Sequence, residues 1–191
     1  STRLYPTIYI PKLEINFAKW VFTMRYPPQP IPLISNITPD KYWAQPKFDG
    51  WRVVRENGEF FTRHGNKLPQ DILTSMLTNT TEYDLDLELV STEGRRKIPT
   101  ILAGSDTHSG QLILLDVMIP DMPIEQRMKI AATIAKQEGI MLAPLQKALS
   151  WTNTNKLVRK AFDHTYGIVC DGIVLKEKTS LYPTSNLGQI C

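Results

Sequence analysis

The stretch that decides the fold is Gln45-Pro46-Lys47-Phe48-Asp49-Gly50-Trp51-Arg52. The residues around its Asp-Gly pair predict one strand over 42–48 and another over 51–56. Taken alone, the stretch is compatible with an ordinary β-hairpin whose charges face water. The alternative is a strand that carries Lys47 into a cleft between sheets, where burial and neighbouring cations lower the pKa of its amine. An unprotonated lysine amine is a nucleophile, and Arg52 would contact a phosphate or ribose of the same bound molecule.

Further elements follow along the chain. Asn57-Gly58 predicts a tight hairpin turn before a strand over 59–62. Hydrophobic patterning predicts three more strands and two helices, and Ser150 is expected to cap the second helix. The strands are expected over 83–91, 111–118 and 172–177, and the helices over 123–138 and 151–162. Because strands dominate and helices are interspersed, the fold class predicted is α+β with mostly antiparallel sheets.

The first 40 residues have a different composition. Eight of the 14 prolines lie in residues 1–46, and proline lacks the amide hydrogen that a helix interior needs. We therefore interpret 1–40 as a proline-rich, extended lead-in segment with one short helix near residues 13–22. The main domain is expected over 41–191.

Composition excludes several classes of protein. The chain has 191 residues, about one domain, and its 42% hydrophobic residues exclude a disordered polar chain. It contains no apolar run of about 20 residues, so no membrane partner is expected. Two cysteines do not form a disulfide framework, which favours an intracellular, reducing compartment such as the cytoplasm, the nucleus or a virus-infected cell. The net charge of +3 permits a polyanionic partner.

Three later motifs also carry charged groups. Thr62-Arg63-His64-Gly65-Asn66-Lys67 is either a solvated basic turn or a loop that meets phosphates. In Leu85-Asp86-Leu87-Glu88-Leu89-Val90, alternation places Asp86 and Glu88 on one face and the leucines on the other. These acids either form an outer face or point into a cleft, where Glu88 would bind a ribose hydroxyl or a divalent metal. Asp171-Gly172-Ile173-Val174-Leu175-Lys176 is either a plain strand or one whose ends meet a metal and a phosphate.

The four motifs, in this order, resemble those of the covalent nucleotidyltransferase superfamily. This superfamily comprises ATP-dependent DNA ligases, RNA ligases and mRNA capping guanylyltransferases. The resemblance runs from about Gln45 to Asn186 and implies an ATP-grasp-like nucleotidyltransferase (adenylation) domain of mostly antiparallel sheets flanked by helices. Thr62-Arg63-His64-Gly65 is more similar to the second motif of DNA ligases. The function implied is therefore an ATP-dependent polynucleotide ligase that seals nicks in duplex DNA through lysyl-AMP and an adenylated 5′-phosphate.

The resemblance also assigns roles to individual residues. Lys47 would be the catalytic lysine that becomes modified with AMP. ATP and Mg²⁺ would be the cofactors, with Glu88 and Asp171 as metal ligands. Nicked duplex DNA would be the partner, contacted by Arg63, His64 and Lys67. The nucleotide would be bound by a larger set, which comprises Gln45, Asp49, Arg52, Arg63, Glu88 and Lys176.

The sequence also departs from the superfamily pattern. Leu87 stands where a glycine is usual, Leu115 where an aromatic ring stacks on the base, and Gln45 where ligases often have a glutamate. Asp171 is shorter than the ligase glutamate and is more similar to capping enzymes. The trailing Lys-x-Lys pair and the OB-fold are absent from this chain, so a C-terminal OB-fold segment or a partner protein is expected to supply them. The alternatives are a capping guanylyltransferase or RNA ligase, and a catalytically decayed nucleic-acid-binding relative.

Overall fold

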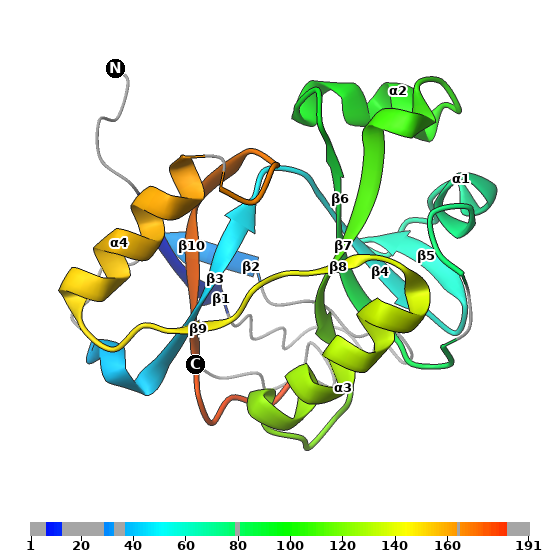
Figure 1. The fold of residues 1–191 in the computed structure, drawn as a ribbon. Coiled ribbons are helices and arrows are strands. Elements are labelled where there is room, and N and C mark those ends of the chain that lie inside the picture. The colour runs from blue at the N-terminus through cyan, green and yellow to red at the C-terminus, as the bar shows by residue number, and fades with distance from the viewer. Residues whose placement is uncertain (1–6, 13–28, 33–36, 79–80, 164, 183–191) are drawn as a thin grey trace.

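Two five-stranded sheets form the framework of the molecule (Figure 1). The computed structural model describes residues 7–12, 29–32, 37–78, 81–163 and 165–182. Sheet A has the strand order β2-β1-β10-β3-β9. Its strands are β1 (Thr7–Lys12), β2 (Gln29–Pro32), β3 (Tyr42–Phe48), β9 (Gln146–Lys147) and β10 (Cys170–Glu177).

Sheet B has the order β5-β4-β6-β7-β8. Its strands are β4 (Trp51–Glu56), β5 (Glu59–Thr62), β6 (Leu85–Ser91), β7 (Gly110–Val117) and β8 (Met141–Leu142). Only the β1–β10 and β7–β8 pairs are parallel among the described strands. The predicted α+β class with mostly antiparallel sheets is confirmed.

Four α-helices flank the sheets in the described residues. They are α1 (Gln70–Thr74), α2 (Ile98–Leu102), α3 (Ile124–Glu138) and α4 (Trp151–Phe162), and short 3₁₀ turns cover Pro39–Lys41, Arg95–Lys97 and Thr107–Ser109. Helix α3 packs against sheet B and α4 against sheet A (Figure 1). The Ser150 cap is confirmed, because its hydroxyl accepts from the Asn153 amide at 3.1 Å. Within the described residues, no helix is long and apolar enough to cross a membrane.

Both faces of β6 are buried. Leu85, Leu87 and Leu89 are fully buried in the main core together with residues of α3. Asp86 and Glu88 point the other way and are 1% and 9% exposed. The predicted division of the strand into an apolar and an acidic face is confirmed. The alternative prediction, an acidic outer face, is wrong. Tyr182, after β10, contacts Asp86, and Lys47 of sheet A lies near Glu88.

The Asp49-Gly50 pair connects the two sheets. A simple hairpin at this position is wrong, because β3 lies in sheet A and β4 in sheet B. The Asp49 amide donates to the Val169 carbonyl at 2.9 Å, which holds the crossing segment against the start of β10. A Cβ atom added at Gly50 would lie 2.2 Å from the Leu89 carbonyl oxygen and 2.9 Å from Val90. The crossover therefore passes so close to β6 that only glycine fits.

The proline-rich beginning of the chain contributes to sheet A. Strand β1 pairs in parallel with β10, with Thr7 opposite Gly172, and β2 forms the edge next to β1. The predicted short helix near 13–22 lies outside the described residues. The domain boundary at residue 40 stays a prediction.

The hairpin prediction is confirmed and other boundaries shift slightly. Asn57 and Gly58 have φ values of +51° and +78°, and Glu56 pairs with Glu59 across the turn. The strands predicted over 83–91, 111–118 and 172–177 are found at Leu85–Ser91, Gly110–Val117 and Cys170–Glu177. The first predicted helix begins at Ile124 because Pro123 is its extended N-cap.

We expect Gly50→Ala to lower the free energy of unfolding by about 1–3 kcal/mol, because the new methyl group overlaps backbone atoms that cannot rotate away. Gly110→Ala is the matched control. Its Cβ would meet only side-chain ends of Ile101 and Met76, at 3.0–3.3 Å, and these can move. Urea unfolding of both variants gives the comparison, and equal losses would contradict the proposed close approach at Gly50.

Candidate active site

Lys47 lies near the end of β3, where sheets A and B meet. Its Nζ donates to both carboxylate oxygens of Asp171, at 2.9 and 3.1 Å. The same nitrogen lies 4.6 Å from the centre of the Tyr9 ring. The side chain of Lys47 is 25% exposed and that of Asp171 is 41% exposed. The lysine is therefore ordered by a carboxylate and a ring, yet a bound molecule can still reach its nitrogen.

Asp171 and Glu88 both act on this lysine from different sheets. Asp171 lies in an irregular part of β10, where the pairing with β3 shifts between Cys170 and Ile173. Burial raises the pKa of Glu88 to about 8, although the nearby Arg52 and Lys47 cations act in the opposite direction. The fold thus gathers two acids from distant parts of the sequence around one amine.

Glu88 and Asp171 do not form a preformed metal site with a third ligand among the described residues. No group of three or more histidine, cysteine, aspartate or glutamate side chains is arranged to hold a metal among the residues that the structure describes. The assignment of Glu88 and Asp171 as Mg²⁺ ligands therefore stays a prediction.

A buried charge cluster lies farther along the same face of sheet B. Arg52 binds both oxygens of Asp86, through its Nε and through Nη2 at 2.6 Å. The hydroxyl of Tyr182 donates to Asp86 Oδ2 at 2.8 Å. Asp86 is 1% exposed and Tyr182 3%. The sequence motifs assigned roles to Arg52 and Glu88 but none to Asp86 or Tyr182. They also did not indicate that Arg52 and Glu88 lie opposite each other on the paired strands β4 and β6.

The remaining predicted nucleotide-binding residues occupy different surroundings. The Gln45 amide nitrogen donates to the Leu115 carbonyl at 3.2 Å, and this side chain is 2% exposed. Burial lowers the pKa of the half-buried Lys176, although the carboxylates of Asp116 and Asp86 act against this shift. Asp49 lies 3.8 Å from the Arg95 guanidinium. Gln45 and Lys176 lie on strands of sheet A, and Asp49 lies where the chain leaves that sheet.

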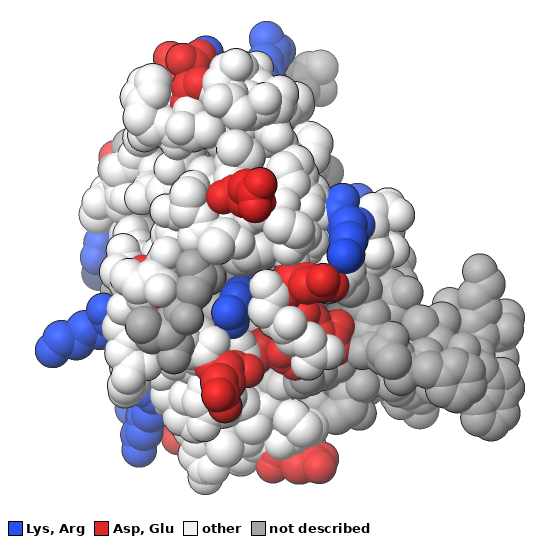
Figure 2. All heavy atoms as spheres, turned by 90° about the vertical axis from the view of Figure 1, so that its right-hand side faces the viewer, with Lys and Arg blue, Asp and Glu red and all other residues white. Residues whose placement is uncertain are grey.

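The predicted DNA contacts lie on the loop after β5. Arg63, His64 and Lys67 are exposed, and the Thr62 hydroxyl accepts from the amides of His64 and Asn66. Thr62 pairs with Val53, so the loop begins at the end of sheet B that also carries Arg52. Lys67 forms an ion pair with Glu59 at 3.2 Å. Figure 2, which shows the side of the molecule near α1 and β5, displays acidic side chains interspersed with basic ones.

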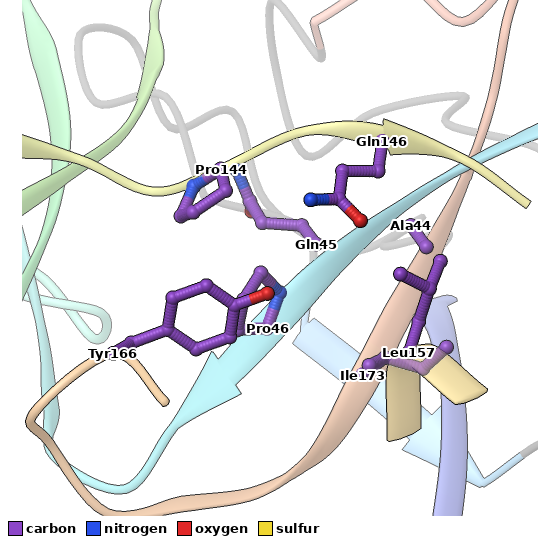
Figure 3. A pocket seen from close by; sticks show the side chains of 8 residues that line it. All are labelled: Ala44, Gln45, Pro46, Pro144, Gln146, Leu157, Tyr166 and Ile173. Carbon is purple, nitrogen blue, oxygen red and sulfur yellow. The ribbon is translucent and has the colours of Figure 1, made fainter. Parts of the chain in front are cut away.

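A small hollow lies beside β3, between α4 and the segment around residue 145. It is lined by Ala44, Gln45, Pro46, Pro144, Gln146, Leu157, Tyr166 and Ile173 (Figure 3). Figure 3 shows the Tyr166 ring beside Pro46. The empty volume is ≈ 190 Å³ even with open solvent counted, below the about 300–1,000 Å³ of ligand pockets. This hollow is therefore too small to hold a whole nucleotide.

Two mostly antiparallel sheets therefore meet at Lys47, with one acid from each sheet near its amine. The chain matches the adenylation domains of ATP-dependent DNA ligases in fold over about three quarters of its length. The resemblance in fold to these domains and the fold class, both expected from the sequence, are therefore confirmed.

Three solved structures illustrate the match. A Lig E DNA ligase, reported as binding DNA with a minimal scaffold, aligns with a TM-score of 0.62 and 17% identity over 78% of this chain and 60% of its own. Chlorella virus DNA ligase-adenylate aligns with a TM-score of 0.61 and 14% identity, over 76% of this chain and 56% of its own. The ligase domain of M. tuberculosis LigD aligns with a TM-score of 0.54 and 14% identity, over 78% of this chain and 52% of its own. The chain thus spans less than two thirds of these ligases, and no family model and no curated protein matches its sequence.

The raised pKa of Glu88 predicts a pH-dependent stability. A carboxyl group with a pKa of about 8 when folded, against an ordinary 4.5, favours folding fully below pH 4.5. That contribution is lost as the pH rises from 4.5 to 8, because the group ionises in the unfolded chain while it stays neutral in the folded protein. Glu88→Gln keeps the shape and stays neutral, so its stability should change less between pH 5 and 8. Urea unfolding across this range tests it, and parallel curves for both proteins would contradict a buried, neutral Glu88.

Proposed function

We propose that this chain is the adenylation domain of an ATP-dependent DNA ligase. The observation that carries the proposal is the contact of Lys47 with Asp171 at the junction of two sheets that match ligase domains in fold. Arg52 and Glu88, opposite each other on neighbouring strands, lie on the other side of the same junction. This set combines a nucleophile, acids and a cation, which are the groups needed to handle a nucleoside triphosphate.

The first chemical step would take place at Lys47 Nζ. The amine must lose a proton before it can attack, and the Asp171 carboxylate, 2.9 Å away, is an adjacent acceptor. Nζ then attacks the α-phosphorus of ATP, so that a nitrogen–phosphorus bond forms and the bond to the leaving pyrophosphate breaks. Lys47 is left as lysyl-AMP. Burial keeps much of Glu88 neutral at pH 7, so its carboxyl group can donate a hydrogen bond to a ribose oxygen.

The residues present fit a Mg²⁺ ion that binds together with the nucleotide. Mg²⁺ in phosphoryl-transfer sites is usually held by one or two carboxylates, phosphate oxygens and waters, so a closed cage of acids is not required. Asp171, whose side chain is 41% exposed, would be one ligand. Glu88 would be a second in its ionised form, in place of its role as a donor to the ribose. When bound, the ion neutralises charge on the transferring phosphoryl group.

The orientation of Gln45 supports ATP over GTP. Its Nε2 donates to the Leu115 carbonyl, so the opposite end of the amide is a carbonyl oxygen, an acceptor. Adenine presents an amino group at its 6-position, which donates to such an acceptor. Guanine presents a carbonyl oxygen there, which cannot donate to the Gln45 oxygen. A Gln45 held in this way would therefore favour adenine.

The later steps of ligation follow from the proposed substrate. AMP would pass from Lys47 to the 5′-phosphate at a nick, and the 3′-hydroxyl would then displace AMP and seal the strand. The solved relatives are DNA ligases, one of them reported as binding DNA with a minimal scaffold. Because the chain spans only part of these proteins, the complete sealing reaction is a proposal for this chain.

The nucleophile is tested by incubation with radiolabelled ATP or GTP and Mg²⁺. We expect ATP to label the protein and Lys47→Ala to abolish the labelling, at least a hundred-fold, while circular dichroism stays unchanged. Lys47→Arg should not restore it, because a guanidinium remains protonated. Lys156→Ala, an exposed lysine on α4, is the matched control and should label normally.

The same assay separates the alternatives. Labelling by GTP in place of ATP would contradict the ligase assignment and favour a capping guanylyltransferase. Labelling by neither nucleotide would favour a nucleic-acid-binding relative that has lost catalysis.

The loop after β5 is tested by binding to a nicked duplex. Affinity for DNA follows the number of phosphates neutralised, so a net charge of +3 predicts weak, strongly salt-dependent binding. Arg63→Ala should weaken binding and lower the slope of log affinity against log salt by about 1, whereas Arg159→Ala on α4 should not. Fluorescence anisotropy at several salt concentrations measures both. An unchanged slope for Arg63→Ala would exclude this loop from the interface.

A further inference from the structure

The chain crosses from sheet A to sheet B immediately after β10. The Ser180 carbonyl accepts from Arg127 Nη1 at 3.0 Å and from the Ile124 amide at 3.2 Å, which fastens the segment to the start of α3. Leu181 forms a bridge with Pro123 in the same region. The strand that carries Asp171 and Lys176 is therefore followed directly by a segment anchored on the opposite sheet.

Tyr182 ends this described segment in a fully enclosed position. Its ring packs with Val54 and Met118, and the guanidinium carbon of Arg127 lies 5.7 Å from the ring centre. Its hydroxyl donates to Asp86 Oδ2 at 2.8 Å. Burial, with the Asp86 charge as a second cause, raises the pKa of Tyr182 well above its usual value of 10. The hydroxyl therefore keeps its proton and acts as a donor throughout the neutral range.

The oxygen that accepts from Tyr182 is also bound by Arg52. Asp86 Oδ2 receives Arg52 Nη2 at 2.6 Å, and Oδ1 receives Arg52 Nε. A bidentate pair between a guanidinium and a carboxylate is planar, so the plane of the carboxylate sets the plane of the guanidinium. A third donor on the same carboxylate restricts its rotation, and with it the rotation of Arg52.

We propose that Tyr182 is a positioning residue for Arg52, which it orients toward a bound nucleotide through Asp86. The proposal rests on the proposed function, in which Arg52 contacts the ribose or phosphate. Through this chain of contacts, the segment that follows β10 influences how the opposite sheet holds the nucleotide. In this proposal, Asp86 and Tyr182 act through Arg52 and not on the reacting atoms.

The test compares Tyr182→Phe with the wild type. The variant keeps the buried ring and removes only the hydroxyl, so the fold should persist. Thr154→Val is the matched control, because it removes a fully buried hydroxyl on α4 that donates to the Ser150 carbonyl at 2.7 Å. For Tyr182→Phe we expect the KM for ATP in self-adenylation to rise about five- to ten-fold, with the maximal rate within about two-fold of the wild type. Thr154→Val should leave KM unchanged.

A second measurement does not depend on activity. The Nε hydrogen of Arg52 should exchange with water slowly in the wild type and about five-fold faster or more in Tyr182→Phe, as measured by ¹⁵N NMR. An unchanged KM, or an equal rise in Thr154→Val, would overturn the role of Tyr182 toward the nucleotide. If the wild type takes no label from ATP, the proposed function fails. The exchange rate of Arg52 then still decides whether Tyr182 orients it, and an unchanged rate would overturn the positioning.

Discussion

The buried carboxylate of Asp86 is the constraint on which the arrangement of the cleft depends. An ionised group that is 1% exposed costs several kcal/mol in lost hydration unless charged and polar partners surround it. Asp86 meets this cost with Arg52 from β4 and Tyr182 from the segment after β10. Removal of either partner leaves part of the carboxylate uncompensated. The three groups are therefore tied together, although they come from three separated parts of the chain.

A second buried carboxylate, that of Asp116, is also paired with an arginine, Arg127. Asp116 and Arg127 are both nearly buried and form a bidentate contact at 3.0 and 3.1 Å, and Arg127 also donates to Ser180. The two pairs hold β4, β6, β7, α3 and the end of the chain's described part in one framework. Lys47 and Asp171, in contrast, are partly exposed and face the same junction. A rigid, buried support beside an accessible reactive pair suits a site that must admit and release a nucleotide.

Local patterns in the sequence were enough to predict most regular elements. Strands β3, β4 and β5 begin and end where alternation and the Asn57-Gly58 turn place them, and α4 begins after its Ser150 cap. The same patterns did not indicate that β3 and β4 belong to different sheets. Close approach of Gly50 to β6 decides that point, and this contact joins residues far apart in the sequence. The prolines also hid the edge strand β2, because proline is compatible with edge strands as well as with extended lead-in segments.

The candidate site was predictable only in part. The motif order pointed to Lys47, Asp171, Glu88 and Arg52. In the structure Lys47 donates to Asp171, and its charge also acts on the pKa of Glu88. For Asp86 the sequence left open an outer acidic face or a position in the cleft, since nothing in its strand shows that a tyrosine ninety-six positions later donates to it. Tyr182 carried no signal, because a single tyrosine outside any motif fits many roles. Such pairings depend on tertiary packing, which short motifs do not encode.

The central claim is that Lys47 is the covalent attachment point, and peptide mapping tests it most directly. After incubation with ATP and Mg²⁺, the protein is digested with trypsin, which cleaves after unmodified lysine and arginine. A modified Lys47 resists cleavage, so the account predicts an AMP-bearing peptide over residues 42–52 that contains an intact Lys47–Phe48 bond. AMP found on another lysine, with complete cleavage after Lys47, would contradict the account.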